Sequence, residues 1–78
     1  MMKIKTASGV EFDYDMISEI PNPARLYIHL QNTTLSDVMS VLSGENGLPF
    51  EGFSEYRFIQ SVAVGHFGVN VALKKTFD

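Results

Sequence analysis

The chain has 78 residues, the size of one domain, so we expect a single domain spanning residues 1–78. It is 45% hydrophobic and 19% charged, which is typical of globular chains rather than disordered ones. Its lack of cysteine excludes a disulfide framework, a thiolate zinc site and a cysteine nucleophile.

The charge of the chain argues against nucleic acid and membranes as partners. Six basic residues stand against nine acidic ones, giving a net charge of −3. Proteins that bind nucleic acid normally present a basic stripe, and none is visible in this sequence. No apolar window approaches the ~20 residues that a membrane-spanning helix needs.

Two strands with alternating apolar and polar residues are expected over Met2–Thr6 and Val10–Met16. A two-residue loop would set Lys5 opposite Phe12 and mix the two faces, whereas a three-residue loop ending at Gly9 keeps them separate. Such loops need a left-handed last residue, which glycine supplies at no steric cost. The expected apolar face holds Val10, Phe12, Tyr14 and Met16, and the expected pairs are Thr6–Val10, Ile4–Phe12, Met2–Tyr14, Lys5–Glu11 and Lys3–Asp13.

A third strand is expected over Arg25–Gln31, after a break at residues 21–23. The break contains two prolines, which lack the N–H donor that a central strand needs. One face of this strand carries Leu26, Ile28 and Leu30, and the other carries Arg25, Tyr27, His29 and Gln31.

A short helix follows, with Thr34 as its N-cap and Gly44 where a C-terminal cap belongs. Its expected apolar stripe consists of Leu35, Val38, Met39 and Leu42. A helix of about ten residues is unstable in isolation, so the stripe must dock on a sheet.

The rest of the chain predicts a loop over residues 45–49 and a closing hairpin of Tyr56–Val64 with Val69–Lys75. Residues 50–53 fit either a short edge strand or an irregular link, and the sequence leaves both open. The expected pairs are Val64–Val69, Val62–Val71 and Gln60–Leu73, with Ser61 and Ala72 on the opposite face. We therefore expect an α+β fold: a mainly antiparallel sheet of about five strands in the order β-β-β-α-β-β, with one short helix packed on it.

No constellation of catalytic or metal-ligating residues stands out. The histidines, His29 and His66, lack the spacing of zinc ligands, and no serine lies in a nucleophile motif. Three acidic side chains share a strand face, but a flat strand does not wrap a cation as calcium loops do. We expect no enzyme activity and no cofactor.

The feature least explained by a small core is the density of aromatic residues. Aromatic side chains are enriched in protein–protein contacts, where they bury a large area at low entropic cost. We therefore predict that partner-binding residues are found among Phe50, Phe53, Tyr56, Tyr27 and His29.

Four segments carry a resemblance to known proteins. These are M-K-I-x-T-A-x-G at residues 2–9, R-L-Y-I-H-L at 25–30, T-L-S-D-V at 34–38 and V-N-V-A-L-K-K at 69–75. In this layout the chain resembles small β-rich proteins encoded by phages and prophages. The resemblance implies a phage context, in the cytoplasm of a bacterial host or in a virion, and it does not point to any particular activity.

Three hypotheses follow for the function. The first is a non-catalytic interaction or assembly module that self-associates, such as a phage or prophage accessory structural protein. The second is a small regulatory protein that binds and inhibits a host protein. The third is an enzyme or ligand-binding protein whose site forms between subunits. The expected partner is therefore the chain itself, or another phage or host protein.

Overall fold

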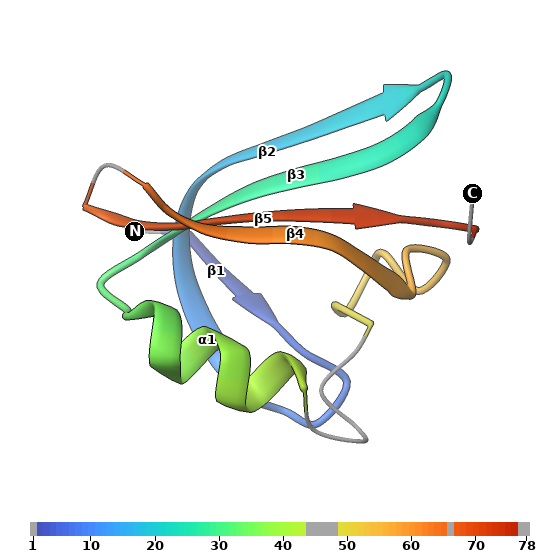
Figure 1. The fold of residues 1–78 in the computed structure, drawn as a ribbon. Helices are drawn as coiled ribbons and strands as arrows, with labels where there is room; N and C mark the ends of the chain where they lie inside the picture. Colours follow the sequence, from blue (N-terminus) through green and yellow to red (C-terminus); the bar gives the residue numbers. More distant parts are fainter. Residues whose placement is uncertain (1, 44–48, 66, 77–78) are drawn as a thin grey trace.

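The computed structural model of the protein describes residues 2–43, 49–65 and 67–76. Within these residues five strands form one antiparallel sheet in the order β1-β2-β3-β5-β4, and one helix packs on it (Figure 1). The elements are β1 (Met2–Lys5), β2 (Glu11–Pro21), β3 (Ala24–Gln31), α1 (Leu35–Leu42), β4 (Phe58–Gly65) and β5 (Gly68–Lys74). The expected α+β class and element order are confirmed.

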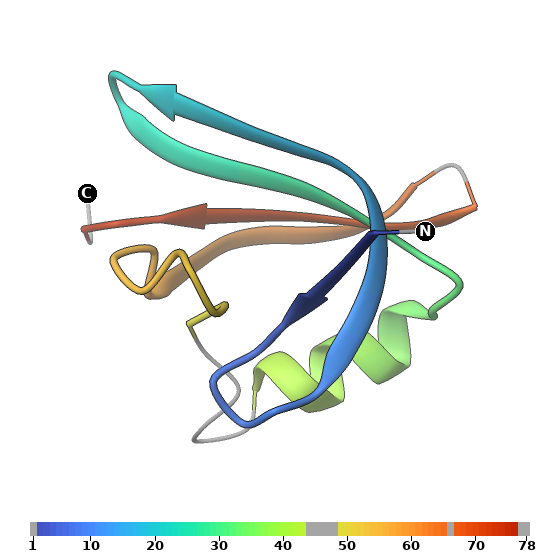
Figure 2. The same cartoon turned by 180° about the vertical axis from the view of Figure 1, so that it is seen from behind.

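The sheet is bent along β2, which is eleven residues long. The ladder between β2 and β3 shifts register between Tyr14 and Met16, as at a β-bulge. Figures 1 and 2 show the consequence: the first half of β2 runs beside β1, whereas the second half turns away with β3 as a projecting hairpin. Helix α1 packs on the face enclosed by this bend and contacts β4 and β5.

The core lies on this enclosed inner face of the sheet. Its centre is formed by three cross-strand pairs of β3 and β5, in which every side chain is at most 1% exposed: Leu26–Leu73, Ile28–Val71 and Leu30–Val69. Val38 and Leu42 of α1 close over these pairs. The opposite, outer face carries the alternate residues of the same strands, among them Tyr27 and His29, which are half-buried.

The first hairpin has the predicted register, with Ile4 opposite Phe12. Gly9 adopts the left-handed conformation expected of it, with φ of +92°. The prediction for the second strand is wrong in two respects: β2 continues to Pro21, and Met16 lies opposite His29 on the outer face, 43% exposed. The extra residue at the bulge turns Met16 away from the face that carries Phe12, because strand side chains alternate.

The helix begins as predicted, with the Thr34 hydroxyl accepting a hydrogen bond from the Asp37 N–H at 3.1 Å. Its apolar stripe docks only in part, since Leu35 and Met39 are 36% and 45% exposed. The expected cap at Gly44 and most of the predicted loop lie outside the described residues. No helix in the described part of the chain has the length and apolar character needed to cross a membrane.

The segment at residues 50–53 forms a single bridge rather than a strand, between Phe50 and Thr6. In the last hairpin the predicted pairs Val64–Val69 and Val62–Val71 are confirmed. The predicted pairing of Gln60 with Leu73 is wrong, because a register shift next to Gln60 sets Ile59 opposite Leu73 instead.

Candidate functional site

The two outer strands of the sheet, β1 and β4, differ in how their free edges are covered. The segment before β4 bonds to the end of β1 on its far side. The Glu51 N–H donates to the carbonyl of Lys5, the last residue of β1, at 2.7 Å, and just beyond the strand the Ala7 N–H donates to the Pro49 carbonyl at 2.8 Å. Strand β4 pairs only with β5 among the described residues. Along an antiparallel edge strand, every second residue turns its N–H and C=O away from the sheet, so β4 presents an open row of donors and acceptors.

The sequence of β4 does little to block pairing with another strand. Natural edge strands are usually protected by charged side chains, by proline or by bulges. Strand β4 reads FIQSVAVG, with neither a charge nor a proline, and its bulge lies near the start, next to Gln60. The stretch from Ser61 to Gly65 therefore offers an uninterrupted and uncharged edge.

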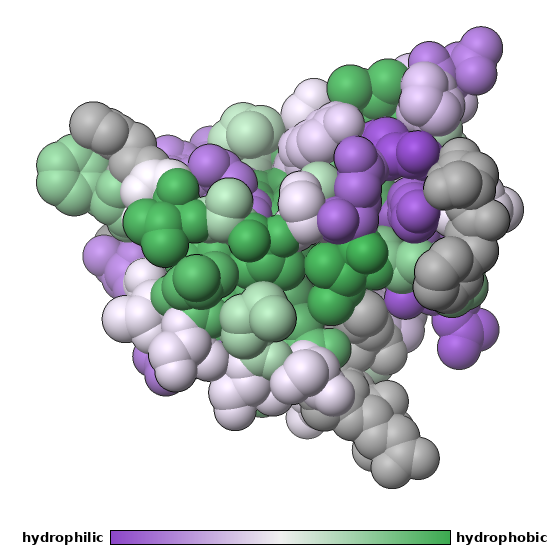
Figure 3. Space-filling view, viewed as in Figure 1, coloured by the Kyte–Doolittle hydropathy of each residue, from purple (hydrophilic) through white to green (hydrophobic). Residues whose placement is uncertain are grey.

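Apolar side chains continue from this edge onto α1. Val64 is 71% exposed, and Figure 3 shows a continuous hydrophobic band that crosses β4 and α1. We call this surface the β4–α1 patch and define it by Leu35, Met39, Val62 and Val64. Large exposed apolar patches on small proteins mark interaction sites or aggregation hazards.

Two of the predicted partner-binding residues lie in the core instead. Phe50 and Tyr56 are 0% and 3% exposed, so they have almost no surface to offer a partner, and the prediction of partner binding falls to the other three residues. The reason is that the link before β4 folds back over the end of the sheet and buries both rings. The Tyr56 hydroxyl donates to Glu19 of β2 at 2.9 Å, and Lys75 lies 5.2 Å from the centre of its ring.

The other predicted residues lie apart from the β4–α1 patch. Phe53 is half-buried against the core, whereas Tyr27 and His29 lie half-buried on the outer face. Partner binding by these three residues stays a prediction. Exposed Val64 and Met39, which the sequence had assigned to the apolar faces of a strand and a helix, were missed. The one signal in the sequence for Val64 and Met39 is that it has more apolar positions than one short helix can cover.

The outer face carries a groove of about 370 Å³ that crosses β2, β3, β5 and β4. Its lining is Met16, Ser18, Tyr27, Ile28, Ser61, Ala63, Asn70, Val71 and Ala72, and none of these residues is charged. A second hollow next to it shares Met16 and Asn70, and is completed by Asp15, His29, Gln31 and Phe67. The sequence did not predict this groove, because it forms only where the outer faces of β2, β3, β5 and β4 meet.

His29 is held by an acidic neighbour at the edge of the groove. Its Nδ1 lies 2.6 Å from Oδ1 of Asp15, so Nδ1 carries the hydrogen and the carboxylate accepts it. Its Nε2 is buried and has no hydrogen-bond partner among the described residues. Among the described residues, no group of three or more His, Asp or Glu side chains is placed to hold a metal ion.

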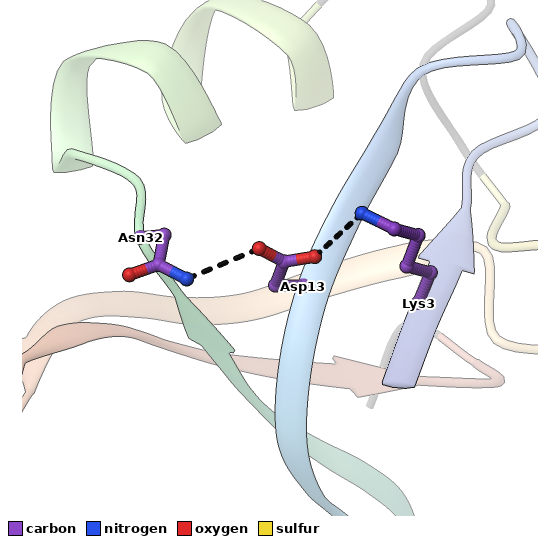
Figure 4. A network of polar contacts seen from close by, with 3 residues as sticks. All are labelled: Lys3, Asp13 and Asn32. Atoms are coloured by element: carbon purple, nitrogen blue, oxygen red, sulfur yellow. Dashed lines mark hydrogen bonds and ion pairs between the residues drawn. The ribbon is translucent and has the colours of Figure 1, made fainter. Parts of the chain in front are cut away.

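A polar network at the first hairpin lies away from both the β4–α1 patch and the groove. Lys3 donates to Asp13 at 2.8 Å, and the Asn32 amide donates to the other oxygen of the same carboxylate at 3.1 Å (Figure 4). The hydrogen bond from Lys3, followed by that from Asn32, lowers the pKa of Asp13 below its ordinary value. The network ties β1, β2 and the residues before α1 together.

No family model, no curated protein and no solved structure matches this chain.

Proposed function

We propose that this protein is a non-catalytic interaction module that self-associates through the β4–α1 patch. The observation that carries the proposal is the combination of an open, uncharged strand edge with exposed apolar side chains beside it. A second copy offers both halves of what this surface lacks, namely a strand to pair with β4 and an apolar cover for Val64 and Met39.

Charge favours this surface over the rest of the molecule for contact between identical chains. Each chain has a net charge of −3, so two copies repel one another wherever charged faces meet. The β4–α1 patch contains no charged residue. Antiparallel pairing of β4 with its copy about a two-fold axis would join two five-stranded sheets into one and close both edges.

The size of the molecule is adequate for such a contact. A stable interface buries about 800 Å² on each partner. The accessible surface of the chain is 4805 Å², so a dimer needs about one sixth of it. An eight-residue strand together with one side of α1 is a surface of this order.

Sedimentation velocity across a range of concentrations tests the proposal. We expect a defined oligomer for the native chain and a shift towards monomer for Val64→Lys, which places a charge in the patch at a position that is 71% exposed. The matched control is Ser36→Lys, an exposed residue of α1 outside the patch, which should sediment like the native chain. A native chain that stays monomeric, or equal effects of both lysines, contradicts self-association.

A monomeric native chain would favour the second candidate, a small regulatory protein that accepts a strand from another protein on the same open edge. From the sequence resemblance alone, we also propose that the chain is of phage or prophage origin and has a place in a virion. Tail or capsid genes beside the gene for this chain would support a role in assembly.

A further inference from the structure

The groove on the outer face has the chemistry of a site for an uncharged ring. Its volume of about 370 Å³ lies at the lower end of the range for ligand pockets. The small side chains of Ser61, Ala63 and Ala72 line the part contributed by β4 and β5, whereas Tyr27 and Met16 come from β3 and β2. Aromatic and thioether side chains both make favourable contacts with rings, and the absence of a charged lining residue disfavours an ionic ligand.

The chain itself carries an exposed ring of this kind. Phe67 is 86% exposed at the turn between β4 and β5, which projects beyond the body of the molecule (Figures 1 and 2). Its φ is +60°, in the left-handed region that bulky side chains rarely adopt. The ring therefore lies outside the core, and residues in such conformations cluster at functional positions.

The ring and the groove lie on the same face of the sheet. Phe67 lines the second hollow, which shares Met16 and Asn70 with the groove. An isologous contact is reciprocal, so in a two-fold dimer in which the ring of one copy enters the groove of the other, the second ring enters the first groove as well. The molecule measures 29 × 25 × 20 Å, so its broad face is comparable with the roughly 800 Å² per partner that a stable dimer buries.

We propose that the outer-face groove is a second self-association site, which takes the side chain of Phe67 of the partner subunit. The inference rests on the proposed function in that both require self-association, but it uses the opposite face of the sheet. With the β4–α1 patch and the outer face both engaged, assembly extends beyond a dimer, as expected of a structural module.

The test removes the ring and fills the groove in separate variants. Phe67→Gly deletes the ring and accepts the positive φ without strain. Ala63→Leu fills the groove from an exposed position whose side chain lies on the face opposite Val64. The matched control is Thr76→Leu, an exposed residue that does not line the groove. Circular dichroism would check that each variant is folded.

We expect Phe67→Gly and Ala63→Leu each to weaken self-association roughly 10- to 100-fold for each buried ring that is lost. The two variants complement each other, since the first keeps an open groove and the second keeps the ring. A fluorescently labelled Phe67→Gly chain should therefore bind Ala63→Leu more tightly than either variant binds itself. Sedimentation of Thr76→Leu should match that of the native chain.

The outcomes separate this inference from the proposed function. If Val64→Lys weakens assembly while Phe67→Gly and Ala63→Leu sediment like the native chain, the β4–α1 patch stands and the groove contact is overturned. The reverse pattern supports the groove and contradicts the patch. A mixture of the two groove variants that binds no better than either alone overturns the pairing of ring and groove. The pairing of ring and groove is also overturned if Phe67→Gly leaves assembly unchanged while free indole binds saturably in the groove. The groove would then be a site for a small molecule.

Discussion

Phe50 forms an isolated antiparallel bridge with Thr6, and this bridge covers the end of the β1 edge of the sheet. The two hydrogen bonds that flank it join residues 49–51 to Lys5, the last residue of β1, and to Ala7. The same link continues into β4, so the segment that covers one edge leads directly to the strand that leaves the other edge open. The difference between the two edges is thus built by one short connection.

Replacing Phe50 with alanine should destabilise the fold strongly. The ring is completely buried, and truncating a buried Phe typically costs about 3–5 kcal/mol. A domain of 78 residues has a total stability of only about 4–12 kcal/mol, so much of it would be lost. Urea denaturation measures the loss, with Phe53→Ala, a half-buried neighbour, as the milder control. Equal midpoints for the two variants would mean that Phe50 does not anchor the link.

Gly68→Ala should destabilise the sheet at the start of β5. A Cβ on Gly68 would lie 1.9 Å from the Leu30 carbonyl oxygen, a backbone atom that cannot move without disturbing the ladder of β3 and β5. We expect a loss of about 1–3 kcal/mol, as for other overpacked sites. The comparison is Gly65→Ala, where the Cβ would meet the end of the Asn70 side chain, which can turn aside. The midpoint temperature of thermal unfolding should therefore be lower for Gly68→Ala than for Gly65→Ala. The opposite order would contradict the close approach of Gly68 to the Leu30 carbonyl.

Asp13 should contribute to the stability of the fold at neutral pH and lose this contribution in acid. Its pKa is lowered, first by the hydrogen bond from Lys3 and then by that from Asn32. A lowered pKa means that the ionised carboxyl stabilises the folded state above its ordinary value of 3.8, and that the stabilisation disappears as the pH falls through the folded value. Asp13→Asn should therefore be less stable than the native chain at pH 7, with the difference shrinking below pH 3.8. Denaturant midpoints measured across this range test it, with Glu11→Gln on the same strand as the control. A difference that does not change with pH would contradict the assignment.

Features fixed by neighbouring residues could be predicted from the sequence. The loop at Gly9 needs a left-handed residue and the helix needs a hydroxyl cap at Thr34, and both requirements are local. The cross-strand pairs of the first hairpin then follow from alternation alone. The core face of β3 was predictable for the same reason.

Features that depend on distant segments could not be predicted. The bulges beside Met16 and Gln60 each shift an alternating pattern by one residue, and nothing in the local sequence marks the shift. The hydroxyl of the buried Tyr56 is bonded by Glu19, which is 37 positions away in the chain. The exposure of Val64 depends on where α1 docks. The groove is lined by residues of four strands, so its lining could not be predicted from any one segment of the sequence.

Tyr56 should keep its proton at a pH where an ordinary tyrosine loses it. Burial, and then the hydrogen bond to Glu19, raise its pKa above the ordinary value of 10.0. Because the folded state holds this proton more tightly, the stabilisation is complete below pH 10.0 and is lost as the pH rises through the folded pKa. The ultraviolet titration of tyrosinate should show a late step that Tyr56→Phe removes and that Tyr27→Phe, on the outer face, retains. The native chain should also lose its stability advantage over Tyr56→Phe above pH 10.0. If the late step survives in Tyr56→Phe, the hydroxyl is not held between the core and Glu19, and the link that covers β1 is anchored in another way.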